Sequence, residues 1–277
     1  MTQTASTNQT LSSKLDEIVA RKRREVSELK ATDPYGRWTR EAKETAYERR
    51  DFAAALRSGT PLAVIAEIKR ASPSAGTINA DFDPLEVASS YAAAGASALS
   101  ILTDEPDFGG HVDILRAVRS MQAASGHPSP PILRKDFLID EAQLWESVAI
   151  GADAVLLIAE CLPGEQLRDM HQAALGMGLQ TLIELYDAAN LDRVLACDPG
   201  VVGVNNRDLQ TFSVDIGHSR RLRKAVPPSV VFVSESGLKT RDDTAPLIEA
   251  GVDAILVGET LMRSADIGAT MRELRGM

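Results

Sequence analysis

The chain alternates short apolar runs with stretches of helical period, and this alternation constrains its fold more than any other feature. Eight runs have the length of a strand and are apolar on both faces, as is typical of parallel strands covered by helices. They are LAVIAEI (62–68), SALSIL (97–102), PPILRK (130–135), DAVLLIA (153–159), TLIEL (181–185), VVGVN (201–205), VVFVSE (230–235) and DAILVG (253–258). Strict alternation of strand and helix indicates a parallel sheet, and eight such units predict an α/β fold, the (β/α)8 TIM barrel.

A doubly wound open sheet is the alternative architecture. It normally carries a glycine-rich turn after its first strand, whereas this chain has Ser72-Pro73-Ser74. A weak internal repeat supports the barrel, because AAGASAL (93–99), IGADAVLL (150–157) and AGVDAILV (250–257) share a helix end, a glycine and a new apolar run. Glycine fits this position because helices often end with a residue in the left-handed region.

Residues 1–60 contain no strand candidate. The run Ser13-Lys14-Leu15-Asp16 is typical of a helix start, and we expect a second helical stretch from Thr39 to Leu56. We therefore predict an N-terminal helical extension (1–60) packed on a barrel domain (61–277). Whether the extension also caps one end of the barrel is left open.

Charge and composition exclude several classes of protein. The net charge of −9 argues against a nucleic-acid partner, and we predict that the basic run 21–24 is a solvated helix face rather than a contact to phosphates. The chain has no long apolar span and no signal peptide, so we expect no membrane partner. Its two cysteines and four histidines lack metal-ligand spacing, so we expect no metal site and a reduced, cytoplasmic setting.

Polar side chains follow several of the predicted strands. In a barrel of this kind the active site is built at the carboxyl ends of the strands. The residues at those ends are Glu67 with Lys69, Lys135, Glu184, Asn205 with Arg207, and Glu235 with Ser236. A single charged or polar residue after a strand is more often a solvated loop residue than part of a site. The coincidence of these residues at so many strand ends predicts one active-site mouth that holds two lysines and up to three glutamates.

The last two predicted strands end in small residues. The runs Ser234-Glu235-Ser236-Gly237 and Val257-Gly258-Glu259-Thr260 leave space for backbone N–H groups to approach a ligand. This part of such barrels frequently holds a phosphate, so we predict a phosphorylated small-molecule ligand. No GxxxxGKS or GxxxxGKT loop is present, which argues against nucleotide hydrolysis.

A set of motifs recurs in order along the chain, from about Leu11 to Arg272. The motifs are Glu67-x-Lys69-x-x-Ser72-Pro73-Ser74, Ser100-Ile101-Leu102-Thr103, Arg134-Lys135-Asp136-Phe137, Leu182-Ile183-Glu184, Asn205-x-Arg207-Asp208-Leu209, Ser234-Glu235-Ser236-Gly237 and Gly258-Glu259-x-Leu261-Met262-Arg263. Together they resemble indole-3-glycerol phosphate synthase.

This resemblance implies ring closure, decarboxylation and dehydration of 1-(2-carboxyphenylamino)-1-deoxyribulose 5-phosphate. The product would be indole-3-glycerol phosphate, an intermediate of tryptophan biosynthesis. The resemblance implies no cofactor and no metal, and it leaves open contacts with other enzymes of the pathway. Because the chain ends after one barrel, we expect a monofunctional enzyme.

The resemblance also implies roles for individual residues. Lys135 would be the general acid of ring closure, and Glu184 the proton-transfer partner in dehydration. Lys69 would hold the substrate carboxylate, and Glu67 and Asn205 would orient these groups and bind hydroxyls. Ser236, near the phosphate, completes the catalytic candidates. The implied substrate-binding residues are Ser72, Ser74, Arg207, Gly237, Gly258 and Glu259, and, as an apolar wall for the anthranilate ring, Phe108, Phe137 and Leu209.

Several points stay open in the sequence. Phe108 and Phe137 could equally be core residues, and either Lys69 or Lys135 could be the acid in each step. Burial would favour a neutral Lys135 and the glutamates a charged one. The chain departs from the family at Tyr186, where histidine is frequent, and at Asp107, where an aromatic residue is common. A Schiff-base lyase and a non-catalytic, metabolite-binding barrel are the alternative functions.

Overall fold

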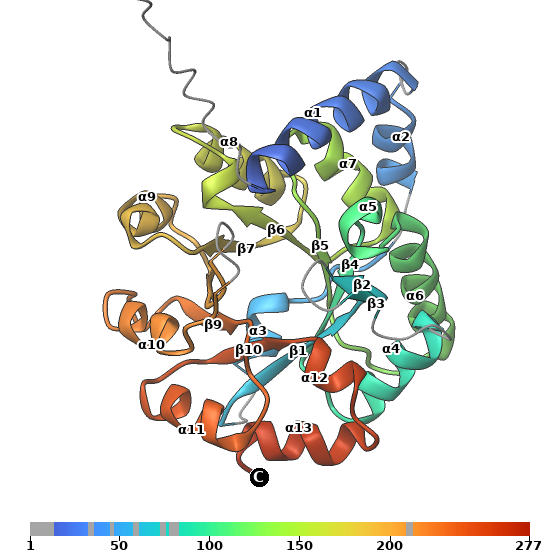
Figure 1. The fold of residues 1–277 in the computed structure, drawn as a ribbon. Helices are drawn as coiled ribbons and strands as arrows, with labels where there is room; N and C mark the ends of the chain where they lie inside the picture. The colour runs from blue at the N-terminus through green and yellow to red at the C-terminus, as the bar shows by residue number, and fades with distance from the viewer. Residues whose placement is uncertain are drawn as a thin grey trace, which may run out of the picture.

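The centre of the computed structural model is a closed barrel of parallel strands (Figure 1). The structure describes residues 14–32, 36–44, 47–57, 61–72, 76–77, 83–208 and 213–277. The strands follow one another around the barrel in the order β1-β10-β9-β8-β7-β6-β5-β4. Their bounds are β1 Ala63–Ile68, β4 Ala98–Leu102, β5 Ile132–Lys135, β6 Ala154–Ile158, β7 Gln180–Leu185, β8 Val201–Asn205, β9 Val231–Glu235 and β10 Ala254–Val257. Each strand coincides with one predicted apolar run, although β7 begins one residue before its run, so the (β/α)8 barrel is confirmed and the open sheet was the wrong alternative.

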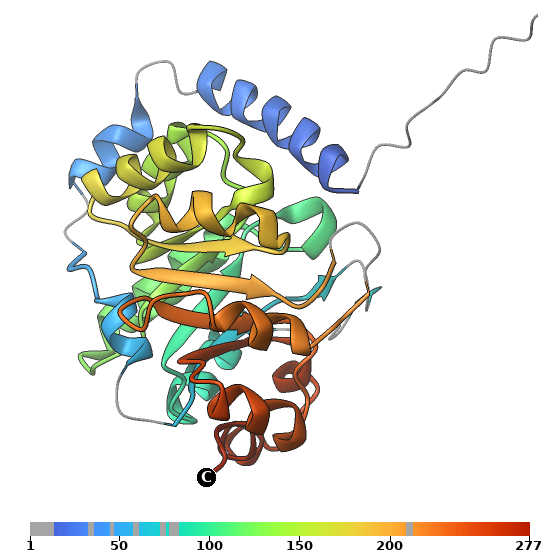
Figure 2. The same cartoon turned by 90° about the vertical axis from the view of Figure 1, so that its left-hand side faces the viewer.

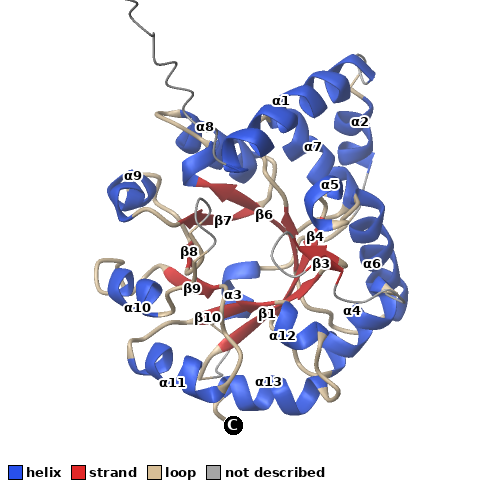
Figure 3. Cartoon of the chain, in the orientation of Figure 1, coloured by secondary structure: helices blue, strands red, loops and turns tan. Residues whose placement is uncertain are grey.

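Helices surround the barrel as an outer ring (Figure 3). The longer ones are α4 Pro84–Ala93, α6 Val112–Ser125, α7 Glu141–Ile150, α8 Gln166–Gly176, α9 Leu191–Leu195, α10 Gly217–Arg223, α11 Arg241–Glu249 and α13 Ile267–Arg275. Short turns of helix follow four strands: α5 Glu105–Phe108, η1 Ala159–Cys161, η2 Ala188–Asn190 and α12 Glu259–Met262. Within the described ranges, no helix has both the length and the apolar character needed to cross a membrane.

A small antiparallel ladder follows β1. Its two short strands are Ala71–Ser72 (β2) and Gly76–Thr77 (β3). This ladder lies beyond the carboxyl end of β1, where it contacts α5. Pro73 and Ser74 of the Ser72-Pro73-Ser74 motif lie outside the described residues.

The internal repeat has a structural cause. Its glycines Gly95, Gly151 and Gly251 all have positive φ and follow helix ends, as predicted. The polar residue two positions later accepts a hydrogen bond from the backbone N–H of a neighbouring strand. These bonds run from Val64 N to Ser97 Oγ (3.3 Å), from Ile132 N to Asp153 Oδ2 (2.7 Å) and from Phe232 N to Asp253 Oδ2 (2.8 Å). The repeat therefore ties adjacent strands together at the end of the barrel where the strands begin.

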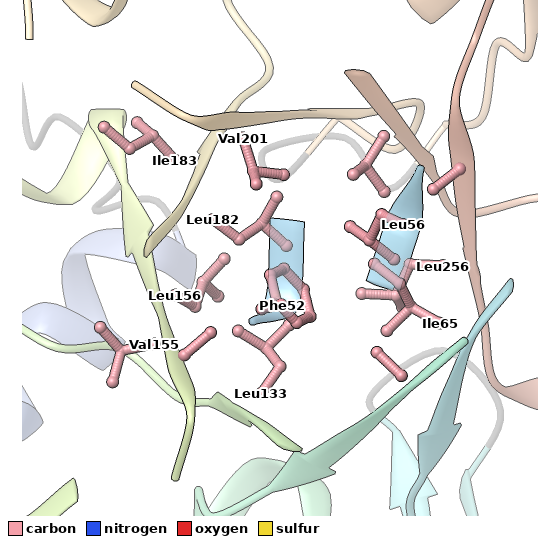
Figure 4. Packing of buried hydrophobic residues seen from close by; sticks show 14 of the residues in the cluster. Phe52, Leu56, Ile65, Leu133, Val155, Leu156, Leu182, Ile183, Val201 and Leu256 are labelled. Carbon is pink, nitrogen blue, oxygen red and sulfur yellow. The ribbon is translucent and has the colours of Figure 1, made fainter. Parts of the chain in front are cut away.

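Apolar side chains fill the barrel, and the short helix α3 (Phe52–Leu56) closes one end of it. Phe52 is fully buried and lies in the middle of the ring of core side chains (Figure 4). Just before the helix, Asp51 Oδ1 accepts a hydrogen bond of 2.9 Å from Gln180 Nε2, at the start of β7. The N-terminal segment thus caps the end at which the strands begin, opposite the predicted active site.

The other N-terminal helices, α1 (Lys14–Thr32) and α2 (Arg37–Glu44), contact α7, and α1 lies along the outside of the molecule (Figure 2). The prediction of one helical stretch from Thr39 to Leu56 is wrong, because residues 47–51 are not helical. Two tertiary contacts explain the break. The Arg50 backbone N–H and guanidinium bind the buried carboxylate of Asp153, and Asp51 caps the start of α3.

Candidate active site

A cavity of about 660 Å³ opens at the carboxyl ends of the barrel strands. Its lining includes every predicted site residue except Ser72, Ser74 and Leu209. Ser74 and Leu209 lie outside the described residues, and of Ser72 only the backbone is described. The predicted residues that line it are Glu67, Lys69, Phe108, Lys135, Phe137, Glu184, Asn205, Arg207, Ser236, Gly237, Gly258 and Glu259. The structure therefore brings these residues together, while their individual roles stay predictions.

The centre of the cavity wall is a cluster around Lys135, the last residue of β5. Its ammonium group lies 2.7 Å from Glu184 Oε2 and 3.3 Å from Glu235 Oε2. Asn205 Nδ2 donates a hydrogen bond of 3.0 Å to the other oxygen of Glu184. The four side chains come from β5, β7, β8 and β9, so barrel closure is what assembles them.

The surrounding charges decide the protonation of Lys135. Burial alone would lower the pKa of this lysine, but the carboxylates of Glu184, Glu235 and Glu67 raise it above its ordinary value. The effect of the glutamates on the pKa of Lys135 therefore exceeds the effect of burial, which the sequence could not decide. Lys135 is an ammonium ion. Burial also acts on the carboxyl groups: it raises the pKa of Glu235 to about 8, whereas Lys135 holds the pKa of Glu184 below its usual range despite burial.

A second pair lies at the end of β1. Lys69 Nζ is 2.6 Å from Glu67 Oε1, which confirms that the two side chains point to the same side. Gly258, directly after β10, leaves the space that this pair occupies. A Cβ atom at position 258 would lie 2.5 Å from Glu67 Oε1 and 3.0 Å from Lys69 Cε. Gly258 is therefore a glycine because any side chain would displace the pair.

The end of β9 is a strained turn. Ser236 has φ +71° and Gly237 has φ +84°, so two consecutive residues adopt the left-handed conformation. Ser236 is not a glycine, and such backbone strain is concentrated at functional sites. Buried Asn206 supports the turn by donating from Nδ2 to the carbonyl oxygen of Ser236 (3.2 Å). This turn and Gly258 surround the part of the cavity where the phosphate was predicted.

The aromatic residues form one side of the cavity. The ring centroids of Phe108 and Phe137 are 6.3 Å apart, and the rings are tilted by 38°. Both side chains line the cavity and are partly buried, and Phe137 also packs against the hydrophobic core. Their position fits an apolar wall against which an aromatic ring can pack.

Helix α1 reaches the site through buried ion pairs, which corrects the prediction of a solvated basic face. Lys22 is 4% exposed, and its ammonium group lies 2.8 Å from Asp104 Oδ1 and 2.7 Å from Asp136 Oδ1. Asp136 directly follows Lys135, and its Oδ2 accepts a hydrogen bond of 2.6 Å from Thr103 Oγ1. Only Arg23 and Arg24 of the basic run are exposed. Lys22 had no distinguishing signal in the sequence, because its partners lie far along the chain.

The two departures from the family both have local partners. Asp107 binds helix α1, with Lys14 Nζ 2.8 Å from Oδ1 and Arg21 Nη2 2.8 Å from Oδ2. Tyr186 packs on His218 at a centroid distance of 4.9 Å, and its carbonyl oxygen is 2.6 Å from His218 Nε2. Neither residue lines the cavity, so their effect on the site is indirect.

The stability of the protein should depend on pH through Asp136. Burial would raise the pKa of this carboxyl group, but Arg134 and Lys22 lower it from 3.8 to about 2. A depressed pKa means that the ionised group stabilises the fold above its unfolded-state pKa and loses this contribution as the pH falls through the folded-state value. We expect Asp136→Asn to be much less stable than the wild type at pH 7, with a difference that shrinks as the pH falls from 3.8 to about 2. Urea unfolding across this range measures it, and a difference independent of pH would contradict the assignment.

Sequence reasoning missed two further residues of the site. Glu235 was predicted at the carboxyl end of a strand, but the sequence suggested no role for it. In the structure it contacts Lys135, the central lysine of the site. Asn206 was not considered, because its neighbour Asn205 already accounted for the end of β8. The only signal for it was a second amide side chain at the same strand end. Among the described residues, no group of three or more histidine, cysteine, aspartate or glutamate side chains could hold a metal ion.

Comparisons with known proteins agree with this geometry. The family model of indole-3-glycerol phosphate synthase matches residues 15–274. The protein of that name from Rhodopirellula baltica is 47% identical over 260 residues, covering 94% of this chain and 98% of the relative. The one from Roseiflexus castenholzii is 44% identical over 264 residues, covering 95% of this chain and 98% of the relative.

Solved structures of distant proteins share the architecture. 3-Hexulose-6-phosphate synthase from Salmonella typhimurium matches with a TM-score of 0.60 at 12% identity, covering 78% of this chain and 97% of that chain. Thiamine phosphate pyrophosphorylase from Pyrococcus furiosus matches with a TM-score of 0.58 at 16% identity, covering 82% and 96%. At such low identity the likeness shows the fold alone.

Proposed function

Because this chain belongs to the indole-3-glycerol phosphate synthase family, we propose that the cluster around Lys135 carries out the proton transfers of that family's reaction. The chain is a carboxy-lyase of tryptophan biosynthesis. It closes, decarboxylates and dehydrates 1-(2-carboxyphenylamino)-1-deoxyribulose 5-phosphate to give indole-3-glycerol phosphate. What remains to be assigned is the part that each residue plays.

Lys135 is the general acid of ring closure. Attack of the aromatic ring on the ketone places negative charge on the carbonyl oxygen, and a charged lysine can stabilise that oxygen and then give it a proton. The observation that carries this proposal is the ammonium group of Lys135, which lines the cavity and is paired with the carboxylate of Glu184 at 2.7 Å.

Glu184 is the proton acceptor of the dehydration. Its carboxylate is ionised, buried and oriented by Lys135 and Asn205, so it can accept the proton whose removal restores aromaticity. Lys69 holds the substrate carboxylate before carbon dioxide is lost and can supply the later acid. Glu67, 2.6 Å from Lys69, orients that ammonium group.

The remaining lining residues bind the two ends of the substrate. We assign the phosphate to the pocket formed by Ser236, Gly237, Gly258 and the backbone of Glu259, and we keep Ser72 and Ser74 as predicted ligands of the substrate. Phe108 and Phe137 pack against the anthranilate ring, together with Leu209. Arg207, at the cavity edge, neutralises negative charge of the substrate.

Three wider assignments are part of this proposal. We place the protein in the cytoplasm, where its substrate is formed. We keep residue 60 as the boundary between the N-terminal helical extension and the barrel domain. Contacts with other enzymes of tryptophan biosynthesis stay a prediction, as does the absence of a metal or cofactor requirement.

Mixing the purified protein with its substrate, with and without a chelator, tests the proposal. Indole fluorescence should grow in at the same rate in both samples. Tight binding of the substrate without indole emission would show that the site binds the phosphate but lacks a functional general acid. Borohydride should trap no covalent adduct, since a Schiff base needs a neutral lysine and Lys135 is charged. A trapped adduct would favour the lyase alternative.

A further inference from the structure

One buried carboxyl group of the site has no role in the proposed reaction. Glu235 is 1% exposed, and its Oε2 lies 3.3 Å from Lys135 Nζ. Its Oε1 is also buried and has no hydrogen-bond partner within the described part of the chain. Lys135 already has Glu184 at 2.7 Å, so a second carboxylate is not needed to hold the ammonium group.

The barrel nevertheless reserves space for this group. Gly203 on β8 lies next to it, and a Cβ atom at position 203 would be 2.3 Å from Glu235 Oε1. An alanine there would push the carboxyl group out of its position between Lys135 and Glu184. The carboxyl group of Glu235 is therefore held in place by packing as well as by charge.

The charges that face Glu235 do not balance if it is ionised. They are one cation, Lys135 from β5, and one carboxylate, Glu184 from β7, which contacts the same ammonium group as Glu235. From β8 comes only the neutral amide of Asn205, which is bonded to Glu184. From β1, Glu67 adds a further negative charge near Lys135. Two carboxylates so close together in a buried site cannot both ionise without a large cost, and a shared proton is the usual solution.

We propose that Glu235 works as a neutral carboxylic acid that donates its proton in a hydrogen bond to Glu184, and that it is thereby a positioning residue for the proposed proton acceptor. The proposal rests on the function assigned above to Lys135 and Glu184. Burial and the charge of Glu184 raise the pKa of Glu235 to about 8 although Lys135 opposes them, which agrees with a neutral group at pH 7.

A neutral Glu235 has a consequence for the acid as well. If Glu235 were ionised, a second negative charge would stabilise the ammonium form of Lys135 and make it a weaker proton donor. The protonated form leaves Glu184 as the carboxylate in direct contact with Lys135. It also fixes the Glu184 carboxylate among three donors, Lys135, Asn205 and Glu235, so that this carboxylate faces the cavity in one orientation.

The test compares two matched amide substitutions, Glu235→Gln and Glu184→Gln. Glutamine can donate the hydrogen bond of a protonated glutamate but cannot ionise, so Glu235→Gln should lose far less activity at pH 7 than Glu184→Gln. The wild type should lose kcat as the pH rises through about 8, and Glu235→Gln should not show this fall. Glu184→Gln removes the proposed proton acceptor itself and should lose roughly 10²-fold or more.

Infrared spectroscopy provides a readout that does not depend on turnover. The resting wild type at pH 7 should show the carbonyl stretch of a buried protonated carboxyl group, and this band should be absent from Glu235→Gln. In Glu184→Gln the band should persist and titrate at lower pH, because the neighbouring charge that raises the pKa of Glu235 is gone. This second variant keeps the test decisive if Glu235→Gln folds poorly.

Other outcomes would overturn the proposal. A band that survives in Glu235→Gln would place the proton elsewhere, and no band in the wild type would mean that both carboxyl groups are ionised. A loss in Glu235→Gln as large as that in Glu184→Gln would mean that an ionised Glu235 is required. Failure of the proposed function would look different: Lys135 variants would stay active, while the infrared band would be unaffected.

Discussion

Replacing Lys135 by alanine is expected to lower kcat by roughly 10²–10⁴-fold, the usual contribution of a well-placed proton-transfer group. Without the ammonium group, the charge that develops on the substrate ketone has no donor to stabilise it. The fold should survive, because Glu184 can take up a proton when its cation is removed, and Glu235 is already neutral in our proposal. The measurement is steady-state turnover by indole fluorescence, with circular dichroism to confirm folding.

Lys135→Arg separates charge from proton donation. Arginine keeps the positive charge between the buried carboxylates, so the protein should be as stable as the wild type. Its guanidinium holds its proton too tightly to act as an acid at neutral pH, so turnover should still be lost. Near-wild-type turnover in either variant would contradict the role of Lys135 as the acid.

Replacing Lys22 by methionine is expected to destabilise the protein by about 3–5 kcal/mol, the usual cost of removing one partner of a buried ion pair. Methionine fills the same volume but leaves Asp104 and Asp136 with fewer cations. Burial alone would lower the pKa of Lys22, yet Asp136 and Asp104 raise it, so the lysine is charged in the fold. Urea unfolding at pH 7 measures the change in the free energy of unfolding.

Arg24→Met is the matched control, because Arg24 belongs to the same basic run of α1 but is exposed. This variant should change the free energy of unfolding by less than about 0.5 kcal/mol. Equal effects of the two substitutions would mean that the basic run acts through its net charge rather than through the buried contacts of Lys22.

The fold could be predicted because its signals are local. The alternation of apolar runs and helical stretches specifies a parallel barrel, and the glycines at positions 95, 151 and 251 mark helix ends through their own conformation. The candidate site could be predicted for a related reason. Once the fold is a barrel, the residues that end its strands must meet at one mouth, so Glu67, Lys135 and Glu184 are brought together by topology.

What the sequence could not show depends on distant contacts. Lys22 and Arg24 have the same local surroundings, and only the position of Asp136 across the fold makes one of them buried. The break in the expected second helix depends in the same way on Asp153. The protonation of Lys135 needed the distances to Glu184 and Glu235, since burial and the carboxylates act in opposite directions.

Ser97, Asp153 and Asp253 accept hydrogen bonds from neighbouring strands, and these bonds and the cap formed by α3 all lie at the end of the barrel away from the cavity. The interactions that hold the strands in register are thus separated in space from those that face the substrate. Residues around the mouth can therefore change without loosening the barrel. A new specificity could therefore be evolved at this mouth on an unchanged scaffold.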